Sequence, residues 1–354
     1  MKFLEHLGYN SFFDKFIKSI DLKDFMIGRV VRQGKNIYII KTSDGDFEGN
    51  ISGKLRYNAK IKSDYPAIGD WVLVEYIESQ EQVRIHEILP RKTIIERQEI
   101  RGFGKKQVIA TNVDVAFIVQ DIAYDFNLKR IDRFLAICFA SKIHPEIIFT
   151  KIDIVDKIKL DSYLKKTFKR FGDISVTSLS NKTMKGFATL KKIINYGKTY
   201  CFIGASGAGK STLINNLVGE TVMITKSLRE KTYKGQHTTS HRELFILKNS
   251  GIIIDTPGVR EIGITNNEST LESAFEAIYN IAKSCKFSDC KHLIEPGCKV
   301  LLALENGEIE KSFYDNYHKM KEEQVLFKDA KRGIKNNQAI KKMKSDPNNK
   351  KTKR

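Results

Sequence analysis

The chain has 354 residues, too many for one average domain, and 41% of them are hydrophobic, which is enough for buried cores. Its formal net charge of +19 favours a polyanionic partner, but it does not distinguish nucleic acid from an anionic membrane surface. The N-terminus has no apolar signal-peptide core, and no run approaches the ~18 apolar residues that a membrane-spanning helix needs. We therefore expect a cytoplasmic protein of two or three domains.

Five short runs rich in β-branched and aromatic residues lie within residues 24–90, after an N-terminal segment of residues 1–23. Turn-forming residues separate the runs, and this spacing predicts a small barrel. The OB-fold is the leading interpretation, although an SH3-like barrel would give a similar pattern. The basic charge favours RNA or single strands as the ligand, against the alternative that the barrel binds only protein. The runs are 27–31, 37–40, 46–51, 71–76 and 82–86.

Residues 91–112 form a basic stretch interrupted by Gly102 and Gly104, and we interpret them as a linker. The cations of this stretch, which begins with Arg91 and Lys92, are candidates for phosphate contacts. The alternative is a solvated linker.

From residue 113 to residue 270 the pattern is that of one α/β domain. Apolar strand-like runs alternate with helical periodicity, which is clearest at 127–141. A polar motif follows each of three of these runs directly. Ligands of an open parallel sheet bind beyond the carboxyl ends of its strands, so this placement predicts a ligand site. The runs are 113–119, 146–149, 199–203 and 251–254.

The strongest motif is a complete phosphate-binding loop, GASGAGKS, at residues 204–211. Its glycines let the backbone fold tightly and direct N–H groups at a β-phosphate. Lys210 is expected to reach the β- and γ-phosphates, Ser211 to ligate Mg²⁺, and Thr212 to lie near the α-phosphate. The predicted phosphate-binding residues are Gly204, Ala205, Ser206, Gly207, Ala208, Gly209, Lys210, Ser211 and Thr212.

The sequence TKID at 150–153 is a near match to the NKxD motif that recognises guanine. The carboxylate of Asp153 can accept two parallel hydrogen bonds, from N1–H and the exocyclic amino group of guanine, a donor pair that adenine lacks. The Lys151 stem can lie along the base, and Thr150 offers a hydroxyl where asparagine is commoner. A short generic loop at 177–178 is expected to reach the guanine oxygen. The predicted base-binding residues are Thr150, Lys151, Ile152, Asp153, Thr177 and Ser178.

A metal switch is predicted from the DTPG motif at 255–258, which follows an isoleucine-rich strand. Asp255 is expected to hold Mg²⁺ through water, and the Gly258 N–H to sense the γ-phosphate. The preceding segment GQHTTS should contribute Thr239 to the metal, with Thr238 as the alternative.

The predicted catalytic residue is a histidine of the switch segment. Val259 follows DTPG where Ras-like enzymes place a glutamine that orients water. We expect His237 to orient or deprotonate the attacking water instead, against the alternative of an exposed or partner-binding histidine. The motif order, base before phosphate before metal, indicates a circularly permuted GTPase.

Residues 271–330 are predicted to be largely helical, at 271–284 and 299–327, around a cluster of metal-binding residue types. Three cysteines and one histidine lie within fourteen residues, the set that suits a closed, structural Zn²⁺ site. The alternative is a group of reduced cysteines without a metal. Residues 331–354 carry ten Lys or Arg against one Asp and are expected to be disordered. The predicted zinc ligands are Cys285, Cys290, His292 and Cys298.

Together these motifs resemble the ribosome small-subunit-dependent GTPases of the RsgA (YjeQ) family. TKID, GASGAGKST and DTPG stand in the family's permuted order, and CKFSDCKHLIEPGCKV at 285–300 resembles its zinc knuckle. AIGDWVLVE at 67–75 and GQHTTSHREL at 235–244 also fit, and the likeness extends over about residues 24–327. Gln236 departs from it, since the family often has a basic residue there, and so does the lysine-rich tail.

The resemblance implies an N-terminal OB-fold, a central permuted α/β P-loop GTPase and a C-terminal, mainly helical zinc domain. It further implies late maturation of the 30S subunit, contact with 16S rRNA, and slow GTP hydrolysis that the subunit stimulates. The family's GTP contacts, zinc ligands and proposed catalytic histidine fall on the residues named above. We therefore expect a monomeric GTPase with one structural Zn²⁺, and Mg²⁺ with GTP, that has no membrane partner. The alternative is a GTP-dependent RNA-binding module with little turnover.

Overall fold

The computed structural model describes residues 2–18, 22–34, 37–98, 106–172, 174–219, 242–247, 251–255, 271–272 and 274–325. The chain divides into two compact units, one of Met1–Arg97 with Gln107–Ile262, the other of Gln98–Lys106 with Gly263–Arg354. Within the described ranges, no helix has both the length and the apolar character required to cross a membrane.

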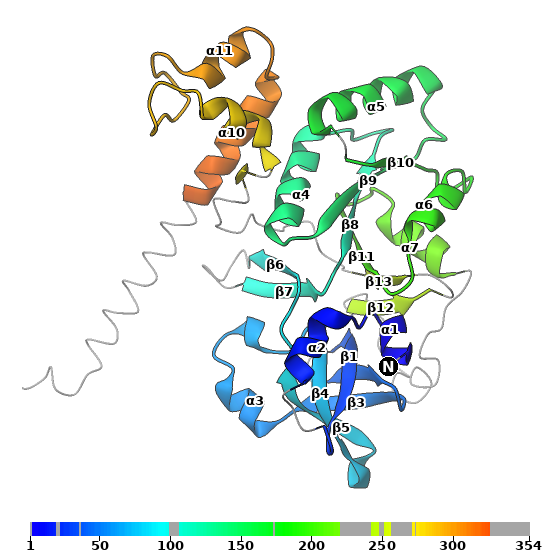
Figure 1. Ribbon diagram of the computed structural model, residues 1–354. Helices are drawn as coiled ribbons and strands as arrows, with labels where there is room; N and C mark the ends of the chain where they lie inside the picture. Colours follow the sequence, from blue (N-terminus) through cyan, green and yellow to red (C-terminus); the bar gives the residue numbers. More distant parts are fainter. Residues whose placement is uncertain are drawn as a thin grey trace, which may run out of the picture. The chain divides into compact units, whose positions relative to one another are not determined.

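The first unit begins with the predicted five-stranded barrel, which the structure confirms (Figure 1). The strands follow the order β1-β2-β3-β5-β4, and β4 pairs with β1 to close the barrel. Valine and isoleucine side chains, among them Val30, Ile40 and Val72, fill its interior. The elements are β1 (Met26–Gln33), β2 (Tyr38–Thr42), β3 (Asp46–Ile51), α3 (Gly53–Asn58), η1 (Lys62–Asp64), β4 (Trp71–Ile77), η2 (Glu78–Gln80) and β5 (Gln82–Ile88).

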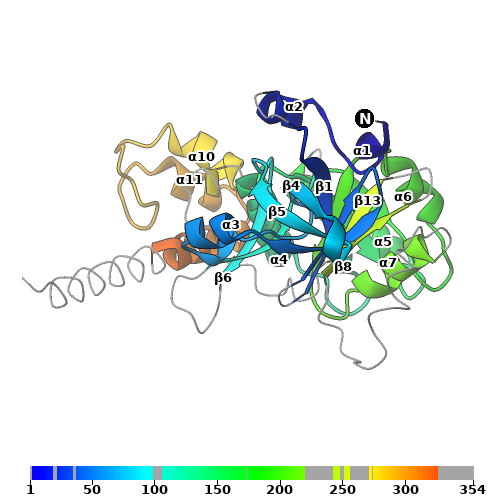
Figure 2. The ribbon, with the colours of Figure 1, turned by 90° about the horizontal axis from the view of Figure 1, so that it is seen from below.

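Two short helices, α1 (Lys2–His6) and α2 (Ser11–Ile17), lie on one side of the barrel (Figure 2). The rings of Tyr9 and Phe13 lie 5.2 and 5.7 Å from the ring of Trp71 at the start of β4. All three side chains are buried, so these contacts seal the N-terminal segment onto the barrel.

A fully buried arginine, Arg29 of β1, joins the barrel to the elements around it. Its guanidinium donates to the Thr199 hydroxyl at 2.9 Å, to the Gly69 carbonyl at 3.3 Å and to the Leu7 carbonyl, and it lies 5.5 Å from the centre of the Trp71 ring. Burial lowers the pKa of Arg29 to about 10, although the negative charges of Asp114 and Asp70 oppose this shift.

The segment interpreted as a linker differs in the structure, because strands β6 (Ile94–Gln98) and β7 (Lys106–Thr111) pair there as a separate two-stranded sheet. Its first cations also serve the fold. Arg91 binds both carboxylate oxygens of the buried Asp70, at 2.8 and 2.7 Å, and Lys92 binds Asp114 at 2.8 Å. Both cations are held by carboxylates and so have a structural role, while contact of this stretch with phosphate stays a prediction.

The second part of the first unit is an α/β sheet with strand order β10-β9-β8-β11-β13-β12. The pairings β10–β9, β9–β8, β8–β11 and β11–β13 are parallel, and β12 is antiparallel to β13. Strand β12 also pairs with β1, so the barrel and this sheet are continuous. The elements are β8 (Val115–Asp121), α4 (Leu128–Ala140), β9 (His144–Thr150), α5 (Lys157–Phe171), β10 (Val176–Ser178), α6 (Phe187–Ile193), β11 (Thr199–Gly204), α7 (Lys210–Val218), β12 (Arg242–Ile246) and β13 (Ile252–Asp255).

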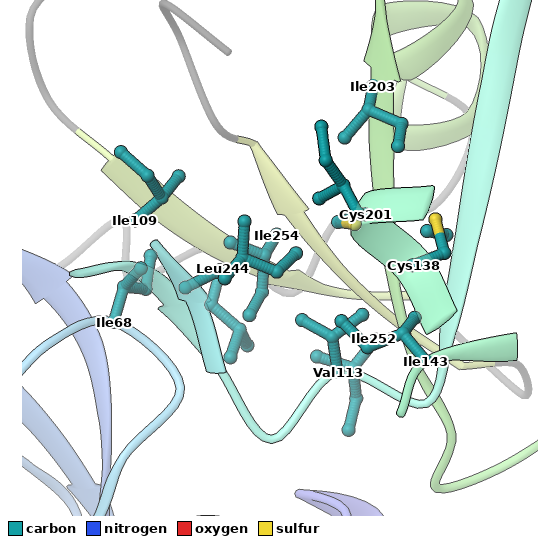
Figure 3. Close-up of a cluster of buried hydrophobic side chains, with 14 of the residues drawn as sticks. Ile68, Ile109, Val113, Cys138, Ile143, Cys201, Ile203, Leu244, Ile252 and Ile254 are labelled. Carbon is teal, nitrogen blue, oxygen red and sulfur yellow. The ribbon is translucent and has the colours of Figure 1, made fainter. Parts of the chain in front are cut away.

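Apolar residues cover both faces of this sheet, as the uninterrupted apolar runs of its strands require. One face packs on α4, where Cys138 belongs to the same buried cluster as Cys201 and Ile252 (Figure 3). Helix α4 starts where its sequence predicts, because the Asn127 side chain accepts a hydrogen bond of 3.1 Å from the Arg130 N–H.

The second unit contains α10 (Glu276–Ala282), α11 (Lys299–Glu305) and a further helix over residues 311–325. The single helix predicted over 299–327 is wrong. Helix α11 ends before Gly307, whose φ of 74° lies in the left-handed region that stops a helix. The ring of Phe275 lies 5.0 Å from that of Phe313 and 5.5 Å from that of Tyr317, and these contacts form a small core.

Candidate nucleotide and metal sites

The predicted base and phosphate motifs meet at the carboxyl edge of the sheet. Strand β9 ends at Thr150, strand β11 ends at Gly204, and β8 lies between them. The buried hydroxyl of Thr150 donates to the carbonyl oxygen of Ala208 in the phosphate loop at 2.8 Å, and it lies 3.3 Å from the Gln120 carbonyl. A direct hydrogen bond therefore connects the two motifs, although 58 residues separate them in sequence.

The loop at 204–211 has the backbone of a phosphate cradle. Gly207 and Gly209 have φ values of 76° and 88°, which side-chain-bearing residues rarely adopt, and Gly209 is the N-cap of α7. A Cβ on Gly204 would lie 2.3 Å from the Val119 carbonyl oxygen, so only glycine fits there. The ammonium of Lys210 binds the carbonyls of Gly204 and Ala205 at 2.8 and 2.5 Å, and these bonds hold it over the loop. Ser206, Gly207, Ser211 and Thr212 are exposed.

Lys151 is fixed at the base motif by contacts that the sequence did not reveal. Its φ of 64° is unusual for a residue with a side chain, and its ammonium lies 2.6 Å from a carboxylate oxygen of Asp121 at the end of β8. The same ammonium lies 4.9 Å from the centre of the exposed Tyr124 ring. These contacts hold the stem of Lys151 in one orientation beside the base motif.

Asp153, the predicted base-discriminating carboxylate, is exposed and receives a hydrogen bond from the buried hydroxyl of Ser180. This bond is the main cause that lowers the pKa of Asp153, and Lys182 adds to the shift. The Ser180 oxygen in turn accepts the backbone N–H groups of Lys182 and Thr183, each at 3.1 Å. The Ser180 hydroxyl therefore favours the ionised form of Asp153, the form that can accept hydrogen bonds from two donors.

The loop after β10 contacts the phosphate loop as well. The Asn181 amide donates to the Gly209 carbonyl at 3.0 Å, and the Asn216 amide of α7 donates to the Asn181 carbonyl at 3.1 Å. Of the two residues predicted here, Thr177 is buried and Ser178 half-buried in β10. No local sequence signal marked Asp121, Ser180 or Asn181, because each acts on a segment distant in sequence.

Asp255 lies at the end of β13, where the prediction placed it. Burial raises the pKa of Asp255, the charge of Glu243 raises it further, and Lys210 lowers it. Lys210 of the phosphate loop therefore acts on the Asp255 carboxylate as an attracting charge. The other switch residues named from the sequence, His237, Thr238, Thr239 and Gly258, lie outside the described residues.

The four predicted zinc ligands converge in the second unit, with all of their ligand atoms within 4.8 Å of one another. Sγ of Cys285 lies 3.9 Å from Sγ of Cys298 and 3.7 Å from Nδ1 of His292, and Nδ1 lies 3.5 Å from Sγ of Cys298. Ligands at Zn–S and Zn–N bond lengths on a tetrahedron are separated by roughly 3.5 to 3.8 Å, so the cluster fits a zinc ion.

The acid–base properties of the cluster also suit a cation. Burial, with the charges of Lys321 and His318, lowers the pKa of His292, which keeps its imidazole neutral and able to bind a metal. Burial and the neighbouring thiols Cys298 and Cys285 raise the pKa of Cys290 to about 11. Three thiolates crowded together repel one another, and a divalent cation relieves that repulsion.

The loop that carries these ligands is shaped by Glu295. Its carboxylate accepts the backbone N–H groups of Lys291, Leu293 and Ile294 at 2.9, 2.8 and 3.1 Å. These bonds, led by that of Leu293, lower the pKa of Glu295 to about 2. The Tyr314 hydroxyl donates to the carbonyl of His292, whose φ of 63° lies in the left-handed region.

Comparison with known proteins gives a consistent result. A family model described as RsgA GTPase matches residues 88–265. The chain is 37% identical over 303 residues to "Small ribosomal subunit biogenesis GTPase RsgA 1" of Bacteroides thetaiotaomicron, covering 85% of this chain and 84% of that one. It is also 37% identical over 300 residues to "Small ribosomal subunit biogenesis GTPase RsgA" of Methanosarcina acetivorans, covering 84% and 79% of the two chains.

Two solved structures resemble the fold of most of the chain. YjeQ from Thermotoga maritima superposes with a TM-score of 0.64 at 26% identity, covering 85% of this chain and 99% of that one. YloQ, described as a circularly permuted GTPase, superposes with a TM-score of 0.62 at 26% identity, covering 87% and 96%.

Proposed function

Because this chain belongs to the RsgA GTPase family, we propose that it hydrolyses GTP to GDP and phosphate and acts in the maturation of the small ribosomal subunit. The observation that carries the GTPase assignment is the hydrogen bond from Thr150 to Ala208, which unites a guanine-type motif with a phosphate loop at one sheet edge. This arrangement supports a single nucleotide bound across both motifs, with its base at Asp153 and its phosphates at Lys210.

Each part of the site has a role in that reaction. Asp153, oriented by Ser180, pairs with the two donors of guanine, while Lys151 lies along the ring. Loop N–H groups and Lys210 neutralise the phosphate charge that spreads in the transition state. Ser211 and Asp255 offer the oxygen ligands that suit Mg²⁺, which supplies further positive charge at the phosphates when bound. We assign to His237 the orientation of the attacking water.

The partners follow from the relatives, which are named as small ribosomal subunit biogenesis GTPases. We infer that the chain binds the small subunit as a monomer in the cytoplasm and that the subunit stimulates its hydrolysis. We assign contacts with 16S rRNA to the barrel of residues 24–90, the zinc domain of residues 271–330 and the basic tail of residues 331–354. The net charge of +19 supports a polyanionic partner.

The test is phosphate release from GTP and from ATP, with and without purified small subunits. We expect phosphate release from GTP and not from ATP, and we expect the subunits to raise the rate of release strongly. Equal release from GTP and ATP would contradict the base assignment. Tight GTP binding without any stimulated release would favour a GTP-dependent RNA-binding module instead.

The role of His237 needs its own variant, because the comparison of nucleotides does not address it. His237→Ala should lower stimulated release while it leaves GTP binding unchanged, since the histidine acts on water and not on the nucleotide. An unaltered release rate would remove His237 from the mechanism.

A further inference from the structure

Three charged residues stand in one row across the joint between the barrel and the nucleotide-binding sheet. Arg32 of β1 lies directly opposite Glu243 of β12, and Glu243 lies directly opposite Asp255 of β13. Residues opposite one another on neighbouring strands project from the same face of a sheet. The row therefore runs from a barrel cation through two carboxylates to the residue assigned to Mg²⁺.

The first two members of the row are in direct contact. The guanidinium of Arg32 forms an ion pair with the carboxylate of Glu243, and their side chains are only 17% and 16% exposed. An ion pair with so little solvent contact is weakly screened by salt. Strand β12 is also the strand through which the barrel joins the sheet, so this pair lies at the connection between the two.

The second and third members repel each other. The carboxylate of Glu243 is close enough to that of Asp255 to act on it electrostatically, and Lys210 attracts Asp255 from the phosphate loop. Like charges on directly opposite residues destabilise a strand pair. Arg32 supplies the positive charge that balances Glu243 and holds its carboxylate toward the barrel, while Lys210 is the cation that acts on Asp255.

We propose that Arg32 is a positioning residue for the nucleotide site: it holds Glu243 toward the barrel and so keeps Asp255 where it can serve the Mg²⁺ of bound GTP. The proposal rests on the proposed role of Asp255 in the GTPase site and extends it to the barrel, which thereby takes part in nucleotide binding. Loss of the Arg32 charge leaves two facing carboxylates, and their repulsion displaces Asp255.

The test measures the binding of a fluorescent, non-hydrolysable GTP analogue to the full chain at increasing Mg²⁺ concentration. Arg32→Gln should raise the Mg²⁺ concentration for half-maximal binding about two- to fivefold, the range that corresponds to a like-charge cross-strand pair. Arg32→Lys should stay near the wild-type value because it keeps the charge. The double variant Arg32→Gln with Glu243→Gln should return toward wild type, because the repelling carboxylate is gone.

The barrel offers a matched control in the ion pair of Lys41 with Asp46, 2.5 Å apart, whose side chains are 13% and 16% exposed. Lys41→Gln removes a cation of similar burial from the β2–β3 pairing and should leave the Mg²⁺ dependence unchanged. If Arg32→Gln behaves like Lys41→Gln, the proposal is wrong. It is equally wrong if the double variant remains as shifted as Arg32→Gln, since the effect would not pass through the Glu243 charge.

Failure of this inference is distinct from failure of the proposed function, because binding requires no turnover. A wild-type chain without subunit-stimulated GTP hydrolysis but with the expected Mg²⁺ shifts would contradict only the proposed function. A wild-type chain with such hydrolysis but with identical Mg²⁺ dependence in all variants would contradict only the role of Arg32.

Discussion

The hydroxyl of Thr150 donates a hydrogen bond of 2.8 Å to the carbonyl oxygen of Ala208, and both residues are buried. Thr150→Val keeps the shape of the side chain and removes the donor, so a buried carbonyl loses its partner. We expect GTP and GDP affinity to fall together by about fivefold, equivalent to about 1 kcal/mol. Thr150→Ser retains the hydroxyl and should bind both nucleotides nearly as wild type in a titration with fluorescent GDP.

A second prediction concerns the orientation of Asp153 by Ser180. The hydroxyl of Ser180 lowers the pKa of Asp153, so the carboxylate needed for guanine stays ionised as the pH falls. Ser180→Ala removes that bond, and the pKa of Asp153 should rise. The acid limb of GDP binding should therefore move to higher pH. It is measured between about pH 3 and pH 7, an interval that includes the ordinary pKa of an aspartate.

Thr183→Ala is the control for this experiment, because the structure uses the backbone N–H of Thr183 and not its side chain toward Ser180. An acid limb that does not move in Ser180→Ala, or that moves equally in Thr183→Ala, would show that Ser180 does not govern Asp153.

A third prediction concerns Glu295 and the zinc loop. Its carboxylate binds three backbone N–H groups of the segment that presents His292. Glu295→Gln loses the charge and one acceptor, so the loop should hold zinc less firmly and release it about tenfold faster to a chromogenic chelator. Glu308→Gln, an exposed glutamate in the same unit, should release zinc at the wild-type rate.

Glu295 also sets a pH dependence whose sign follows from its lowered pKa of about 2. Because the unfolded carboxyl titrates near 4.3, the contribution of Glu295 to stability is complete above that pH and is lost as the pH falls toward 2. The wild-type second unit should therefore lose stability more steeply in this window than Glu295→Gln, measured by circular dichroism on the metal-free chain.

A fourth prediction concerns Arg29. Arg29→Met keeps an apolar stem but leaves the Thr199 hydroxyl and the carbonyls of Gly69 and Leu7 without their buried donor. The free energy of unfolding should fall by about 3 to 5 kcal/mol. Urea denaturation measures this, and Arg84→Met, which removes an exposed arginine 4.0 Å from Glu75, should cost less than about 1 kcal/mol. If Arg29→Met lowered the free energy of unfolding only slightly, the connection between the barrel and the elements around it would not depend on Arg29.

The features that the sequence predicted well are those encoded by neighbouring residues. The phosphate loop is contiguous with the strand before it and the helix after it, and the ligand spacing at 285–298 is itself a metal signature. The helix break at Gly307 has a local signal, because Asn306 and Gly307 form a dipeptide that is typical of a turn.

The features that the sequence did not predict depend on contacts between distant segments. Ser180, which follows β10, hydrogen-bonds Asp153, which follows β9, and Asp121 at the end of β8 binds Lys151. Arg91 reads as a solvent-exposed linker cation until its buried partner Asp70 is known. Polar side chains of this kind follow no sequence periodicity and belong to no motif, because the fold determines their partners and the neighbouring residues do not.

The shared sheet has a consequence for any attempt to dissect this protein. Strand β12 is paired on one side with β13 and on the other with β1, so a chain shortened by removal of the barrel would expose the edge of β12. An uncovered strand edge is a template for pairing with another molecule. A shortened chain would therefore self-associate. Any change in its activity would reflect the exposed edge of β12 as much as the absence of the barrel.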